Sequence, residues 1–170
     1  MKLNARSIAL CAVLTALALG LSTLENLFPV TLIVPLPGVK LGLANIVTVF
    51  ALYELGAVPA LTILTARCLL GGVFAGNLSA LLFSLLGGFT AMLVMIALKH
   101  CKGLSIYGVS IGGAAAHNIG QMAAAVITLG NTMVLSYLPF LLAVSLVTGT
   151  LTGFVAGLLF RAMRTIRLSH

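Results

Sequence analysis

The sequence contains no aspartate, no tryptophan and only two glutamates in a chain of 170 residues. Charged residues make up 6% of the chain and hydrophobic residues 61%, and the stretch 103–160 holds no Asp, Glu, Lys or Arg. A water-soluble fold cannot cover its surface with so few charges. These absences exclude a soluble domain and predict that the chain lies in a lipid bilayer.

The absence of aspartate also argues against catalysis. The sequence has no Ser-His-Asp set, no histidine pair at metal-ligand spacing and no glycine-rich phosphate loop. A polyprenyl synthase, for example, needs an aspartate-rich cluster to hold magnesium and diphosphate, so this chain cannot supply that chemistry alone. We therefore expect no catalytic residues, no metal site and no cofactor. Cys11, Cys68 and Cys101 lie far apart and are interpreted as small apolar fillers.

The apolar stretches are continuous and rich in Leu, Ala, Ile and Gly, which is typical of membrane helices rather than of alternating barrel strands. No polar linker divides them, so residues 1–170 are predicted to form one membrane domain. The first stretch follows Lys2 and Arg6 but lacks a convincing small-residue cleavage site, which favours a retained helix over a signal peptide.

Six helices are predicted from the apolar stretches and the breaks between them. They span about 4–24, 41–53, 59–70, 78–98, 104–129 and 133–164. Pro29, Pro35 and Pro37 exclude a regular helix between the first two, and Gly71-Gly72 is taken as the break after the third. The second and third helices are each shorter than the roughly 20 residues of a full span. Short helices are tolerated where they line a cavity, which is a first indication of a binding site.

The basic residues fix the expected topology. With both termini in the cytoplasm, the inside carries Lys2, Arg6, Lys99, Lys102, Arg161, Arg164 and Arg167, whereas the outside carries only Lys40. This agrees with the positive-inside rule, so the net charge of +7 is attributed to topology and not to nucleic-acid binding. A five-helix alternative is rejected because it would bury Glu54 and move the 99–102 loop to the opposite side. The predicted fold is an all-α integral bundle of six transmembrane helices in a cell membrane, with both termini in the cytoplasm.

The polar residues expected within the membrane gather in the outer half of this bundle. Polar groups in lipid are costly unless they are paired, so each one suggests a functional role. The predicted substrate-binding set is Glu25, Lys40, Asn45, Arg67, His117, Asn118 and Gln121. This set contains two cations, Lys40 and Arg67, and one carboxylate, Glu25. Its net positive charge favours an anionic or zwitterionic ligand.

Each of these residues also has a structural interpretation. Glu25 could be an exposed residue at a helix end, and Arg67 could pair with Glu25 or extend to the interface. His117 could be a hydrogen-bonded strut between helices, with Gln121 on its face at i+4. Asn77 is interpreted as the N-cap of the fourth helix. The sequence leaves these alternatives open, and the gathering on one side favours function.

Small residues recur every four positions on three of the helices. Gly108, Gly112, Ala116, Gly120 and Ala124 follow this spacing in the fifth helix, and Gly149, Gly153 and Gly157 in the sixth. Such rows let helices approach closely in lipid, and these two are assigned to packing within the bundle. Ala12 and Ala16 of the first helix instead offer a smooth face to a partner membrane protein.

Two segments resemble a known family: residues 37–49, PGVKLGLANIVTV, and residues 116–121, AHNIGQ. The chain resembles the Gx transporter family, often labelled heptaprenyl diphosphate synthase component I. That family is similar to the S components of energy-coupling factor transporters, six-helix proteins that bind a vitamin-like solute near the outer face. The resemblance implies that an Ala-xxx-Ala motif, matched by Ala12 and Ala16, docks on a transmembrane coupling subunit driven by two ATPases.

The resemblance leaves two expected functions. The first is a substrate-binding membrane subunit of an importer for a small vitamin-like or anionic solute. The alternative is an accessory membrane component of prenyl diphosphate or quinone synthesis, which would present a lipid substrate to a soluble enzyme.

Overall fold

The computed structural model describes residues 5–27 and 42–168, and this part of the chain folds into helices only. The helices are α1 (Ala5–Leu27), α2 (Leu43–Glu54), α3 (Ala57–Ala75), α4 (Leu78–Lys99), α5 (Ile106–Leu129), the 3-10 helix η2 (Thr132–Tyr137) and α6 (Leu138–Leu168). Six α-helices are therefore present in the described ranges, as the sequence predicts.

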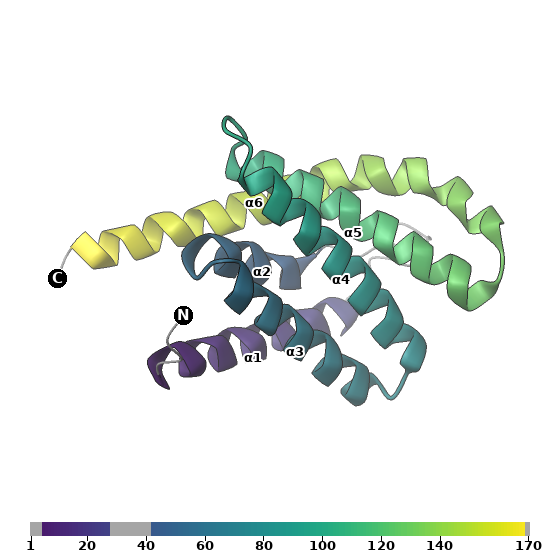
Figure 1. Cartoon of the computed structure of the whole chain (residues 1–170), viewed down its shortest axis with the longest axis horizontal. Coiled ribbons are helices and arrows are strands. Elements are labelled where there is room, and N and C mark those ends of the chain that lie inside the picture. Colours follow the sequence, from purple (N-terminus) through teal and green to yellow (C-terminus); the bar gives the residue numbers. More distant parts are fainter. Residues whose placement is uncertain (1–4, 28–41, 169–170) are drawn as a thin grey trace.

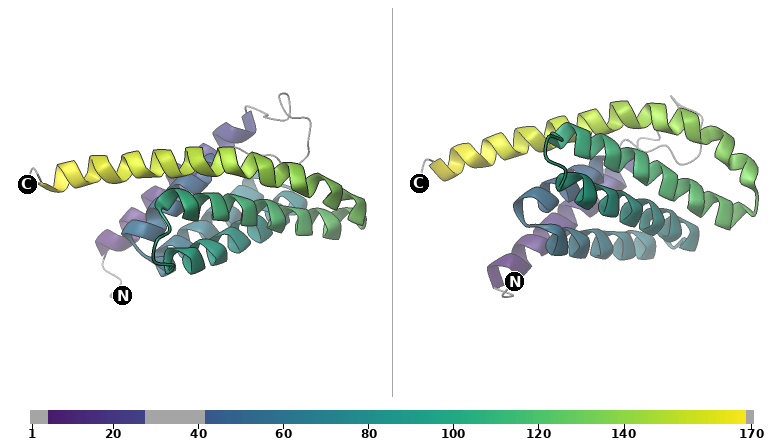
Figure 2. Two further views of the ribbon diagram at one scale, coloured as in Figure 1. Left: turned by 90° about the horizontal axis from the view of Figure 1, so that it is seen from above. Right: turned by 45° about the horizontal axis from the view of Figure 1, so that its top comes forward.

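Successive helices run in opposite directions (Figure 1). We call the end at which α1 begins and α6 ends the proximal end; the turn from α2 to α3 and the loop from α4 to α5 lie there too. The opposite, distal end holds the end of α1, the turn from α3 to α4 and the connection from α5 through η2 to α6. The last turns of α6 project beyond the other helices at the proximal end (Figure 2).

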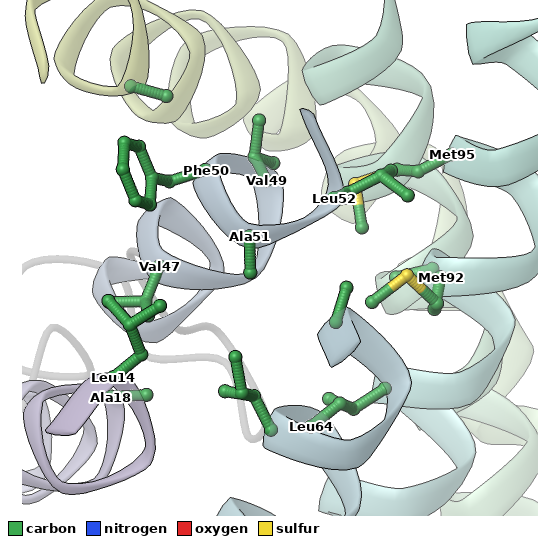
Figure 3. Packing of buried hydrophobic residues seen from close by; sticks show 14 of the residues in the cluster. Leu14, Ala18, Val47, Val49, Phe50, Ala51, Leu52, Leu64, Met92 and Met95 are labelled. Atoms are coloured by element: carbon green, nitrogen blue, oxygen red, sulfur yellow. The ribbon is translucent and has the colours of Figure 1, made fainter. Parts of the chain in front are cut away.

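The short helix α2 lies at the centre of the bundle. It packs against α1, α3 and α6, and eight of its 12 residues are buried. Helix α2 is apolar on all sides, as expected of a helix surrounded by others. Figure 3 shows Leu14 of α1 beside Val47 of α2, and Leu52 of α2 beside Met95 of α4. The ring of Phe50 also stacks on Phe160 of α6, with centroids 5.4 Å apart.

Glycines bring α4, α5 and α6 into close contact. A Cβ at Gly120 of α5 would collide with the backbone carbonyl of Leu86 in α4, and a Cβ at Gly149 of α6 would collide with the backbone of Ile111 in α5. The interpretation of the glycine rows on α5 and α6 as packing surfaces is therefore confirmed.

The prediction that the third helix ends at residue 70 is wrong. Helix α3 continues through Gly71-Gly72 and ends at Ala75. It is followed by the C-cap residue Gly76, which has a left-handed φ of +59°. A Cβ at Gly72 would lie 2.8 Å from Leu81 Cβ, so the glycine allows α3 and α4 to approach where they meet at the distal turn. Close packing thus outweighs the low helix propensity of two glycines, and α2 alone remains short.

Within the residues that the structure describes, four helical stretches are long and apolar enough to cross a membrane. They are residues 7–25, 57–75, 78–99 and 132–163. Helix α5 has the length for a span, but His117, Asn118 and Gln121 lower its hydropathy. Large apolar side chains face outward, including Val73 and Phe74, each 75% exposed, as expected of a protein surrounded by lipid. The chain is a membrane protein, whereas six spans and cytoplasmic termini remain predictions.

Candidate functional site

A small polar cavity lies toward the distal end, where α1 to α5 meet. It is lined by Ser22, Glu25, Gly42, Ala44, Asn45, Arg67, Ser84, His117 and Gln121. Its volume is about 20 Å³, which is room for about one water molecule. Five of the seven predicted binding residues therefore lie together, although they come from four different helices.

Glu25 connects the end of α1 to the beginning of α2. Its side chain is 7% exposed, and Oε1 accepts a hydrogen bond of 2.7 Å from the backbone N–H of Gly42. Gly42 has a φ of +80° and precedes the first turn of α2, where unpaired N–H groups favour a negative charge. Glu25 is thus a buried cap of α2, and the interpretation of it as an exposed helix-end residue is wrong.

Arg67 lies past the middle of α3 and is 8% exposed. Its Nε and Nη2 atoms are fully buried and have no hydrogen-bond partner among the described residues. No ion pair joins Arg67 to Glu25 in this part of the chain, since the carboxylate instead accepts from Gly42. Guanidinium stays charged in proteins, so two of its buried donors lack the partners that normally offset burial.

His117 and Gln121 approach Arg67 from α5, one turn apart on the same face. Both rest on Gly87 of α4, where a Cβ would lie 2.9 Å from Gln121 Cγ and from His117 Cε1. Gln121 is 1% exposed, and its Oε1 has no hydrogen-bond partner among the described residues. Gly87 therefore makes the space that these two polar side chains occupy.

A second cavity adjoins the first. Its volume is about 190 Å³, and Ser22, Arg67 and Ser84 line both cavities. The remaining lining residues are Leu19, Thr23, Cys68, Gly71, Phe74, Ala75 and Ala80. The cavity lies between α1, α3 and α4, so a solute that contacts Arg67 has room to extend between these helices.

Asn118 is the one described residue of the predicted binding set that does not line these cavities. Asn118 is buried, and its Nδ2 donates a hydrogen bond of 2.9 Å to the carbonyl oxygen of Leu141 in α6. It therefore holds α5 against α6. Lys40 lies outside the described residues.

The sequence interpretation missed Ser22, Ser84 and Gly87. Ser22 precedes Glu25 by three residues, and Ser84 precedes Gly87 by three. This spacing places each pair on one helix face, so the signal was available in the sequence.

The two predicted docking residues lie away from the cavities. Ala12 and Ala16 are both exposed on α1. Val13 and Leu17 beside them are 64% and 51% exposed. This face of α1 is consequently accessible to lipid or to another membrane protein.

A larger cavity of about 420 Å³ lies at the proximal end. It is lined mainly by apolar and aromatic side chains, and its two charged residues, Glu54 and Arg161, each already have an interaction. The distal cavities differ because two donors of Arg67 and an acceptor of Gln121 have no partner within residues 5–27 and 42–168. Unpaired polar groups at a cavity are the better indication of a ligand.

Comparison with known proteins identifies one family. The family described as heptaprenyl diphosphate synthase component I matches residues 14–159. No curated protein and no solved structure gives a significant match. The matched range contains all of the residues that line the distal cavities.

Proposed function

The chain belongs to the heptaprenyl diphosphate synthase component I family, and from this premise we propose that it is a substrate-binding membrane subunit of a larger assembly. The distal cavities are its binding site, and the solute is small and anionic or zwitterionic. The observation that carries this proposal is Arg67, a buried cation beside a cavity, two of whose donors have no partner among the residues that the structure describes. A membrane protein keeps such a group where it has a use, because its burial is costly.

Import is the role that this arrangement supports best. The distal cavities lie toward the end of the bundle opposite the basic 99–102 loop, which is the extracellular end in the predicted topology. The sequence has no phosphate-binding loop for ATP, so energy would come from partner ATPases acting through a transmembrane coupling subunit. Ala12 and Ala16 on the exposed face of α1 are the proposed contacts for that subunit. The assembly would lie in the plasma membrane of a bacterium.

The family's description supports a second candidate. As component I of a prenyl diphosphate synthase, the chain would be an accessory subunit, and a soluble partner would supply the aspartates that bind magnesium and diphosphate. The sequence has no aspartate, so it cannot hold that metal cluster itself.

Purification of the tagged chain from its native membrane in mild detergent separates the two functions. Native mass spectrometry would identify the proteins that remain bound. Import predicts a transmembrane coupling protein together with ATPase subunits, and it predicts uptake of a solute by cells that express all of them. Recovery of a soluble prenyl synthase without ATPases would instead support the accessory role and reject import.

A further inference from the structure

The unpaired atoms of the distal site define the chemistry of its ligand. We propose that the solute carries a planar carboxylate, held by the Nε–Nη2 edge of Arg67, and a hydrogen-bond donor that meets Glu25 and Gln121. This inference rests on the proposed binding function and narrows its substrate class to small carboxylic acids with a neighbouring N–H, ammonium or hydroxyl group.

The carboxylate of the proposed ligand is inferred from the two Arg67 donors that have no partner among the described residues. Nε–H and one N–H of Nη2 lie on the same edge of the guanidinium plane and point in parallel. Two parallel donors match the two oxygens of a carboxylate, and such bidentate pairs are among the strongest charge-assisted hydrogen bonds. Both atoms are fully buried without a protein partner among the described residues. The edge that has no partner in the described part of the chain is thus the one that a carboxylate matches.

The hydrogen-bond donor of the proposed ligand is inferred from the acceptor atoms in the same cavity. Oε1 of Gln121 is buried and has no partner in the described part of the chain. The Glu25 carboxylate also lines the cavity, and its Oε1 accepts a hydrogen bond from Gly42. A ligand that presented only acceptor atoms would leave the Gln121 oxygen desolvated and unpaired and would place its acceptors against the Glu25 carboxylate, which is unfavourable. A donor group on the ligand satisfies both acceptors and also balances the charge of Glu25.

Charge and size argue against a prenyl diphosphate in this site. Arg67 is the single residue of fixed positive charge among the described lining residues, and Glu25 offsets it. A diphosphate carries several negative charges and would remain largely uncompensated. The larger of the two cavities, about 190 Å³, is also below the roughly 300–1,000 Å³ of sites for drug-sized ligands. A heptaprenyl chain is far larger than a ligand that a cavity of this volume can hold.

The test uses the full chain purified from its native membrane into lipid nanodiscs. Wild type, R67K and R161K are each heated, and the small molecules that they release are identified by mass spectrometry. Lysine keeps the positive charge but lacks the parallel donors, and Arg161 is an exposed arginine that serves as the matched control. In parallel, thermal unfolding of wild type is measured with millimolar β-alanine, its primary amide, or inorganic pyrophosphate.

We expect wild type and R161K to release a carboxylic acid, and R67K to bind the same acid roughly tenfold to a hundredfold more weakly. A rise in the melting temperature of wild type with β-alanine but not with its amide would also show that the site requires a carboxylate. This measurement uses wild type alone, so the test holds even if R67K does not fold. A released solute without a carboxylate, undiminished binding by R67K, or stabilisation by pyrophosphate alone overturns the carboxylate proposal and leaves the binding function intact. No released solute and no response to any probe overturns the binding function itself.

Discussion

The contact between α4 and α5 can be tested by adding one methyl group. In Gly120→Ala, the new Cβ would collide with the Leu86 carbonyl and lie 2.8 Å from Thr90 Oγ1. That hydroxyl already donates a hydrogen bond of 2.6 Å to the same Leu86 carbonyl. The obstacle is backbone rather than the flexible end of a side chain, so relief requires a shift of α4 relative to α5.

The expected magnitude is a balance of two effects. Alanine favours the helix over glycine by about 1 kcal/mol. Overpacking a close contact costs about 1–3 kcal/mol. The cost lies at the upper end of this range where the backbone must move. The net loss of stability is therefore about 1–2 kcal/mol, which corresponds to a melting temperature lower by roughly 2–8 °C for a chain of this size.

Gly20→Ala is the matched control. Gly20 is exposed on α1, and a Cβ there would have nothing within 4 Å. This variant keeps the helix-propensity gain without the clash, so its melting temperature should equal or exceed that of wild type. Thermal unfolding of both variants in one detergent, followed by circular dichroism, measures the difference. If Gly120→Ala is as stable as Gly20→Ala, then α4 and α5 do not pack as described.

Three further predictions concern topology, docking and the cap of α2. Cys101 is exposed in the α4–α5 loop, so a membrane-impermeant maleimide should label it only in opened cells; labelling in intact cells would contradict a cytoplasmic loop. Ala12→Leu or Ala16→Leu should abolish co-purification of the coupling partner without changing solute binding, because added bulk blocks close helix approach; an intact complex in both variants would place the partner elsewhere. Glu25→Ala should lower the free energy of unfolding by about 1–3 kcal/mol because the Gly42 N–H loses its acceptor. Glu25→Gln keeps an acceptor and should recover most of this stability, and an equal loss in both would show that the cap is unimportant.

The sequence predicted the helices where local signals and packing agree. Asn77 is the clearest case, since its Oδ1 accepts from the Ser79 N–H at 2.9 Å as an N-cap should. The sequence misplaced the end of α3 because two glycines normally indicate a break. The contact of Gly72 with Leu81, which makes glycine suitable there, depends on a neighbouring helix and is invisible in a local pattern.

The grouping of the polar residues was predicted from the sequence, but their individual contacts were not. The cost of burying polar groups in lipid was enough to bring Arg67, His117 and Gln121 to one region. Residues one position apart on a helix differ in direction by about 100°, so Asn118 turns to α6 while His117 lines the cavity. The partner of Glu25 could not be found from side-chain chemistry, because it is the backbone N–H of Gly42.

The length of α6 ties the protein to the thickness of its bilayer. Its 31 residues measure about 46 Å along the axis, whereas the hydrocarbon core of a typical bilayer is about 30 Å thick. The excess extends past the bundle at the proximal end, where the sequence carries Arg161, Arg164 and Arg167. Basic residues at the end of a membrane helix favour the headgroup phosphates of anionic lipids over hydrocarbon. We therefore expect this end of α6 to lie at the headgroups, and we expect the helix to tilt by different amounts in bilayers of different thickness.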